Sequence, residues 1–464
     1  MNTKQLIRRI ERTASGITSE ILRDLIHDNA SNRDKQIKDY KNYQGDDLPI
    51  SSREFTDPLK LNNKINNDFR GEIVDQGIGY LFGSPITYTL DKGPYQEDDV
   101  SYQRDSDALQ DFLTTNNMED LDLEAGKKQG ICGSVGRILY IDKEGQVRVM
   151  NVPSWEMIYV KDRSLDKMQY AMRYYYVDDV SKDANGKRIE NKRTRVEWYD
   201  DEYIHFYISS GEDFVLDPSE PENPKRHMFN EVPVVEIQNN EERMSDFKKV
   251  EALIDAYDRT LSDAQNEIEE FRLAYMAAKG VSIDAEVVAA ARQTGMFEIP
   301  DDASIEYLTK QINDGFLENH KETLRDNVYR FSKTVDISSD TFTGQGASGE
   351  ARKWILTNLE WRCSIKEMKF KRAAQNMFRI AQSKWNKEDT TIDWKSISIQ
   401  FDRNIPEELS MEAEILQKTA GHISHRKRLE LFSPVRDVDA EMSQIEMERG
   451  DLVNLDEVDE SVDE

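Results

Sequence analysis

The sequence predicts an α+β fold in several parts, and three patterns along its 464 residues support this class. Helical periodicity runs through two segments near the beginning of the chain. Short β-branched and aromatic runs then alternate with Gly, Asp, Asn and Pro between 137 and 239, as in a mostly antiparallel sheet. After "VPVVEIQNN", apolar residues recur at spacings of three and four, which is typical of long helices that pack side by side.

Two helices are expected before the sheet. The first 45 residues favour one helix, which ends at Gly45, and 65–82 favour a second one, which Gly83 and Pro85 terminate. We expect the apolar side of the second helix to pack against the sheet. Six strands follow, whose aromatic residues suit core and cross-strand packing; they are "GRILYID", "QVRVMNV", "MQYAMRYYYV", "TRVEWYD", "YIHFYIS" and "VPVVEIQ".

A stalk that ends in a small knob is predicted after the sheet. Its first helix carries a narrow apolar seam from Phe247 to Phe271, and Ser245 or Asp246 is expected to cap it. The insert that follows contains predicted strands in "LAYMAAKGV", "MFEIP" and "IEYLT" and a predicted helix in "DAEVVAAARQTG". A second helix over 316–335 then brings the chain back.

The stretch "TFTGQGASGEARKW" spaces Gly344, Gly346 and Gly349 like a dinucleotide-binding fingerprint. That fingerprint requires a buried strand before the loop and an acidic residue about 20 positions after it. Here a charged helix precedes the loop, and Lys366 and Lys369 stand near the position of the acid. The composition therefore favours a mobile loop of small polar residues. A nucleotide-binding enzyme that uses these glycines is the alternative.

No catalytic or metal-binding pattern is evident in the sequence. A GxxxxGK[ST] phosphate loop is missing, and His422 and His425 lie three positions apart without a third ligand. Cys132 and Cys363 do not have a metal-binding spacing, so free thiols in a reducing compartment are expected. We therefore expect no enzymatic activity, no cofactor and no metal.

The helix predicted over 350–387 is basic within an acidic chain, with ten bases, three acids and an apolar stripe from Leu356 to Trp385. Two interpretations stay open. Either these bases face water or pair with acids of the same chain, or they form a surface that meets an acidic neighbour. Residues 437–464 hold twelve acids and one base, which predicts disorder.

Charge and hydropathy limit the partners of the chain. Its 90 acids and 62 bases give a net charge of -28, which repels nucleic acid and anionic membranes, so any DNA contact must be local or weak. No apolar run approaches the ~18 residues of a membrane span, and we expect a soluble protein without membrane contact. A monomeric DNA-binding protein is disfavoured, because the bases gather on one helix without a basic, aromatic groove.

Three segments together resemble a known family. They are "NNKINNDFRGEIVDQGIGYLFGSPITY", "HMFNEVPVVEIQNNEERMSDFKKVEALIDAYDRTLSDAQNE" and "IPEELSMEAEILQKTAGHISHRKRLELFSPVRDVDAEMSQIE". Their order and spacing resemble the portal, or head-to-tail connector, proteins of tailed bacteriophages, of the type common in phages of Gram-positive hosts. The resemblance implies a portal-protein fold with an α/β wing (1–240), a stem helix (241–270), a small α/β clip (271–308), a second stem helix (309–336), a tunnel loop (337–349), a long wing helix and strand (350–404), a helical crown (405–436) and the acidic tail (437–464).

The resemblance also implies a function. Twelve copies would form a ring at one capsid vertex, and double-stranded DNA would pass through its channel during packaging and ejection. The implied partners are the terminase large subunit, the head-completion adaptor, and the major capsid and scaffolding proteins. The protein would assemble in the host cytoplasm and remain in the virion.

Candidate site residues follow from the same resemblance. The tunnel loop would place Thr341, Phe342, Thr343, Gly344, Gln345 and Gly346 against DNA, with Phe342 and Gln345 nearest to it. Lys321, Arg325 and Arg330 would line the channel, or would instead pair with Glu318, Glu322 and Asp326 of the same helix. The clip would present Asp284, Glu286, Arg292 and Gln293 to the docking partners.

Overall fold

The computed structural model describes residues 7, 9–10, 17–57, 60–95, 99–162, 167–182, 188–272, 275–279, 304–308, 314–338, 354–385, 392–404, 415–432, 434–435, 438 and 441–447. The chain divides into two compact units. Met1–Gln345 and Lys353–Asn404 form the first unit, and Gly346–Arg352 and Ile405–Glu464 form the second. The first unit mixes helices and sheets, which confirms the predicted α+β class.

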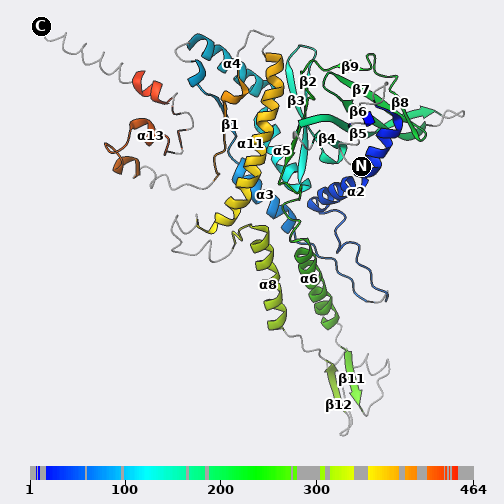
Figure 1. Cartoon of the computed structure of the whole chain (residues 1–464). Coiled ribbons are helices and arrows are strands. Elements are labelled where there is room, and N and C mark those ends of the chain that lie inside the picture. Colours follow the sequence, from blue (N-terminus) through cyan, green and yellow to red (C-terminus); the bar gives the residue numbers. More distant parts are fainter. Residues whose placement is uncertain are drawn as a thin grey trace. The chain divides into compact units, whose positions relative to one another are not determined.

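An N-terminal helix packs against a six-stranded antiparallel sheet (Figure 1). This helix, α2 (Ser19–Tyr43), begins after Thr18, whose side chain accepts a hydrogen bond from the Ile21 amide. Ile21 and Leu22 of α2 share one core with Val196 and Trp198 of the sheet. The strands are β4 (Met157–Asp162), β5 (Lys167–Lys182), β6 (Arg188–Tyr199), β7 (Tyr203–Ser210) and β8 (Asp213–Leu216) in that order, and β9 (Lys225–Arg226) pairs with β7.

A smaller sheet lies beside it, with the antiparallel order β10 (Val234–Gln238), β2 (Ser134–Ile141) and β3 (Val147–Val152). Helices α5 (Met118–Cys132) and α11 (Thr357–Trp385) pack against this sheet, and α4 (Asp99–Thr115) precedes α5. A further pair of strands, β1 (Thr87–Leu90) and β13 (Ile397–Gln400), is also antiparallel. The mostly antiparallel pairing expected for this half of the chain is therefore confirmed.

Helix α3 (Phe69–Phe82) packs mainly against α5 and α11, so the expectation that it packs against a sheet is wrong. Phe82 lies edge-on to Phe370 of α11, with 5.2 Å between the ring centroids. A Cβ atom at Gly126 of α5 would lie only 2.4 Å from Phe82. The glycine therefore allows α3 and α5 to approach closely, and this helical surface buries the apolar side of α3.

The two helices of the predicted stalk are α6 (Glu251–Arg272) and α8 (Asp314–Ser332), which lie side by side (Figure 1); we call this helix pair the stem. Strand β11 (Tyr275–Lys279) follows α6, β12 (Ser304–Leu308) precedes α8, and the two strands pair antiparallel. The helix and the strand expected between 284 and 300 lie outside the described residues. On α8, Leu324 and Val328 are buried as the apolar spacing predicts, whereas Phe331 is exposed.

Helix α6 begins at Glu251, later than the sequence indicates. Among the described residues, neither Ser245 nor Asp246 occupies the N-cap position of this helix, so the expected cap is wrong. Residues 246–250 form turns instead. The reason is that the Asp246 carboxylate already binds Lys366 and Asn239, both at 2.8 Å. Each carboxylate oxygen is thus oriented toward one of these partners, and no described amide at the beginning of α6 donates to Asp246.

In the second unit, α13 (His425–Leu429) begins after Ser424, whose side chain accepts a hydrogen bond from the Lys427 amide. Residues 415–418 are helical as well. Residues 441–447, which lie inside the acidic tail with predicted disorder, are also helical, and the rest of the tail from 448 onward lies outside the described residues.

Candidate functional site

Most of the residues nominated from the sequence lie outside the described part of the chain. They are Thr341, Phe342, Thr343, Gly344, Gln345 and Gly346 of the expected tunnel loop and Asp284, Glu286, Arg292 and Gln293 of the expected clip. Lys321, Arg325 and Arg330 are described, and all three lie on α8. The described part of the candidate site is therefore the stem and its base.

Two bases of α8 lie beside acidic side chains. Lys321 Nζ lies 2.9 Å from Glu318 Oε1, one helical turn away. Arg325 lies 3.5 Å from Asp326 through Nη2 and 3.7 Å from Asp336 through Nε. These pairs are partly exposed, so each contributes about 1 kcal/mol or less to stability. Their acids nevertheless reduce the positive potential of this part of α8.

Arg330, in the last turn of α8, is different. Its guanidinium lies 5.8 Å from the ring centroid of the exposed Phe331. Among the residues described, Arg330 forms no ion pair. A base at this position is favoured by the partial negative charge of a helix C-terminus. Arg330 is therefore the least neutralised of the three candidate channel residues.

Helix α6 binds an extended segment, 60–68, through a polar ladder with one rung per helical turn. Asp258, Ser262 and Asn266 are all buried and form the rungs. The backbone amides of Asn67, Ile65 and Asn63 donate hydrogen bonds to them, in that order, at 3.0, 2.9 and 2.8 Å. Four helical residues advance by about 6.0 Å and two extended residues by about 6.6 Å, which is why alternate amides meet successive turns.

Replacing Asp258 by alanine is expected to lower the free energy of unfolding by about 1–3 kcal/mol, because two Asn67 donors lose their acceptor. Trypsin should then cleave faster after Lys64. Urea unfolding and timed proteolysis measure the two effects. Asp263→Ala is the matched control, since Asp263 lies on the same helix but is exposed, and Arg53 is its only ion-pair partner among the described residues. Equal effects of the two variants would contradict the role of the ladder.

The beginning of α3 joins the two stem helices. The Phe69 ring lies between Tyr257 of α6, at 5.1 Å, and Tyr329 of α8, at 5.9 Å, edge-on to both. Arg70 is buried, and its Nη2 lies 2.6 Å from Asp255 Oδ1 of α6. Consecutive residues of α3 therefore fix both α6 and α8.

The end of α8 is bound to α3 at two further points. Tyr329 donates its hydroxyl hydrogen to Glu72, at 2.9 Å. The Gln76 side chain forms a reciprocal pair with the Val335 backbone, donating at 2.7 Å and accepting at 2.8 Å. Burial raises the pKa of Glu72 although Tyr329 donates to it. These contacts fix the chain where it leaves the stem.

Arg362 of α11 connects three elements at the base of the stem. Its guanidinium donates to the Ser332 carbonyl at 2.9 Å, to Thr334 Oγ1 at 3.0 Å and to the Ile73 carbonyl at 3.1 Å. A planar guanidinium with several donors suits such a junction better than an ammonium group would. The long helix is thus bonded directly to the end of α8 and to α3.

Several bases of α11 pair with acids of the same chain, as one of the two interpretations of this helix expects. Lys366 pairs with Asp246 at 2.8 Å. Lys369 pairs with Glu241, and Arg379 lies 3.0 Å from Glu231. The partners lie in 231–246, far away in sequence, so no local spacing could reveal them. The buried face of α11 includes Leu359, Cys363, Phe370, Ala374, Met377, Ala381 and Trp385, as the sequence predicts.

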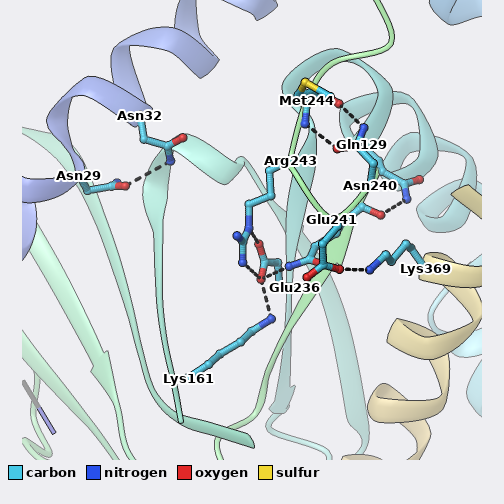
Figure 2. A network of polar contacts seen from close by, with 11 residues as sticks. Asn29, Asn32, Gln129, Lys161, Glu236, Asn240, Glu241, Arg243, Met244 and Lys369 are labelled. Atoms are coloured by element: carbon cyan, nitrogen blue, oxygen red, sulfur yellow. Dashed lines mark hydrogen bonds and ion pairs between the residues drawn. The ribbon is translucent and has the colours of Figure 1, made fainter. Parts of the chain in front are cut away.

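A polar cavity of about 1060 Å³ lies between α2, the two sheets and α11. Glu236 lines this cavity, and its carboxylate lies 2.7 Å from Lys161 Nζ and 3.0 Å from Arg243 Nη2. Figure 2 shows these three side chains together. Burial favours protonation of Glu236, but Arg243 and Lys161 keep its pKa below the usual value. Because the lining comes from distant parts of the chain, sequence reasoning missed this cavity.

The described residues hold neither a candidate membrane span nor a candidate metal cluster. None of their helices is both long and apolar enough to cross a membrane. They contain no group of three or more His, Cys, Asp or Glu side chains that could hold a metal ion. His425 Nδ1 instead lies 2.9 Å from Arg428 Nη2. Cys132 and Cys363 are buried free thiols.

Comparison with known proteins confirms the family that the sequence resembles. The family described as "Phage portal protein, SPP1 Gp6-like" matches residues 22–453. The portal protein of Bacillus phage SPP1 is 25% identical over 424 residues, which cover 87% of this chain and 80% of that protein. The portal protein of Clostridium phage phiCD119 is 24% identical over 441 residues, which cover 87% of this chain and 90% of that protein. Because the match extends over most of its length, this chain belongs to the SPP1 Gp6-like family of phage portal proteins.

Proposed function

We propose that this chain is the portal protein of a tailed phage and forms a ring of twelve copies at one capsid vertex. Double-stranded DNA passes through the ring during packaging and ejection. The family match over residues 22–453 carries this proposal. The pair of stem helices, fixed at its base by α3 and α11, is the element that supplies the wall of a channel.

Helix α8 is proposed to face the channel. One face of α6 is covered by the extended segment 60–68, whereas α8 presents Lys321, Arg325 and Arg330 at its surface. Neighbouring acids balance the first two of these bases. Tight binding of many phosphates would hold DNA in place, so a nearly balanced wall favours sliding. Thr341, Phe342, Thr343, Gly344, Gln345 and Gly346 are proposed to contact DNA from the tunnel loop.

The clip, 271–308, is proposed to dock the terminase large subunit during packaging and the head-completion adaptor afterwards. Asp284, Glu286, Arg292 and Gln293 are the candidate contacts. The major capsid and scaffolding proteins are further proposed partners, with assembly in the host cytoplasm and a final place in the virion. In this function the chain is a structural component without enzymatic activity or cofactor.

The proposal is tested on the full chain and on a variant that lacks 284–295. Electron microscopy and native mass spectrometry are expected to show rings with a central hole for both proteins. A phage-packaging assay should show loss of DNA uptake only for the deletion. Unchanged packaging would contradict the docking role of the clip. A stable monomer that binds a nucleotide in isothermal titration would contradict the channel function.

A further inference from the structure

Helix α8 ends in a backbone conformation that normally selects glycine. Lys333 follows the last residue of the helix and has a φ of 58°. The Thr334 amide donates a hydrogen bond to the Tyr329 carbonyl at 3.0 Å, which is the bond that closes a Schellman motif. Glycine is the usual residue at the left-handed position of this motif, because a Cβ atom there crowds the following carbonyl oxygen. Lysine at this position therefore costs stability.

The described chain offers no partner that would account for this lysine. Of the described lysine and arginine residues, only Arg243 shares the left-handed conformation, and its guanidinium binds the buried Glu236 at 3.0 Å. Lys333 is partly exposed and forms no hydrogen bond or ion pair with another described residue. Its charge suits the negative end of α8, but a base inside the last turn gives the same benefit with a helical backbone. An unfavourable conformation without an internal partner points to an external one.

Arg330 lies one helical turn before Lys333 and also lacks a neutralising acid among the described residues. It is exposed, and its guanidinium lies 5.8 Å from the centroid of the Phe331 ring. It follows the fully buried Val328 by two positions, which turns it to the opposite side of α8 and away from the contact with α6. Positions three apart at a helix end are neighbours, so the two bases form one cationic pair.

The chemistry of this cationic pair fits phosphate groups. Lys321 and Arg325, the other bases nominated on α8, both lie beside acids, whereas the pair at the end of the helix does not. Each strand of a DNA duplex carries one negative charge per about 3.4 Å of helix axis, so a duplex that passes α8 always presents a phosphate nearby. Phosphate contacts do not depend on base sequence, which suits a channel that admits any sequence.

We propose that Arg330 and Lys333 together form a phosphate contact for double-stranded DNA at the end of α8. The inference rests on the channel function proposed above and adds Lys333 to its contact residues. Paired bases along the rest of α8 leave little net charge for phosphates to bind, so DNA slides there and meets an unbalanced charge only at the end of the helix. Each copy supplies one weak, sequence-independent contact, and the ring repeats it.

Protection of lysine side chains from acetylation tests the contact directly. Rings of the full chain are treated with an acetylating reagent with and without a short DNA duplex, and mass spectrometry measures the modification of each lysine. We expect the duplex to slow modification of Lys333 by at least about twofold at low salt, and this protection to disappear at high salt. Lys143, an exposed lysine in the turn between β2 and β3, is the matched control and should show no protection.

Lys333→Gly separates a DNA contact from a structural role. Glycine suits the left-handed position, so this variant should form rings and unfold at the same or a higher urea concentration, measured at a fixed protein concentration. Its affinity for the duplex should nevertheless fall by about fivefold at low salt, and the slope of log K against log salt should shrink by about one. Fluorescence anisotropy measures both values. Lys143→Gly should leave DNA binding unchanged.

Four outcomes would overturn the inference. Rings that bind no duplex, or that bind it without protecting Lys333, would contradict the contact and leave ring formation intact. An unchanged affinity and salt slope for Lys333→Gly would remove the lysine from the DNA contacts. A lower urea midpoint of this variant with normal DNA binding would assign Lys333 to helix termination instead. If the unchanged chain formed no ring, the proposed function would fail, and this contact with it.

Discussion

Replacing Lys366 by methionine is expected to lower the free energy of unfolding by about 3–5 kcal/mol, because it leaves a buried charge without its partner. Lys366 and Asp246 are each 2% exposed, and their charged atoms lie 2.8 Å apart. Burial disfavours the charged form of Asp246, and Lys366 is the main group that keeps its pKa below the usual value. Urea unfolding at a fixed protein concentration measures the change.

Two further variants show whether the stranded charge causes this loss. Lys366→Met with Asp246→Asn is expected to recover most of the stability, because the carboxylate is gone while Asn239 keeps an acceptor. Lys369→Met is the matched control three residues away, since its partner Glu241 has a side chain that is 80% exposed, and it should cost less than about 1 kcal/mol. A similar loss for both lysines would contradict the explanation.

Replacing Asp39 by asparagine is expected to stabilise the protein at pH 7.5 by about 3 kcal/mol. Asp39 is buried on α2, and burial together with the nearby Glu251 raises its pKa to about 6. Its Oδ2 accepts no hydrogen bond from another described residue. The folded state therefore binds the Asp39 proton more tightly than the unfolded state does, and stability falls as the pH rises from about 4 to above 6.

The pH dependence is the decisive part of this prediction. The gain from Asp39→Asn should be full above pH 7, decrease through pH 6 to 5 and vanish below about pH 4, where both states of the native residue are protonated. Urea unfolding at several pH values measures this curve. Asp34→Asn, at an exposed position of the same helix, controls for the general effect of removing a charge. A gain that is equal at all pH values would contradict burial of a charged Asp39.

Local periodicity explains which parts of the fold could be predicted. The strands of the large sheet and the buried face of α11 follow from spacings of two and of three to four residues, which are set within each element. The beginning of α6 could not be predicted, because Asp246 is withdrawn from capping by Lys366, a residue 120 positions away. The packing of α3 was missed for a similar reason, since Gly126 of another helix creates the surface that receives Phe82.

In the candidate site, too, local contacts could be predicted from the sequence and contacts between distant residues could not. The bases of α8 could be nominated because they recur on one helix, and the pairing of Lys321 with Glu318 is a local, i to i+3 contact. The hydrogen bonds between the amides of 63–67 and the polar side chains of α6 could not be predicted from the sequence, because an extended polar segment has no hydrophobic period.

The polar ladder between α6 and segment 60–68 has a mechanical consequence. Successive amides of an extended chain point to opposite sides, so a shift by one residue would turn the bonded amides away from α6. The next matching register is two residues away, about 6.6 Å along the segment. Helix α6 therefore cannot glide by small amounts along this segment. It moves together with the segment as one body or jumps by a whole turn.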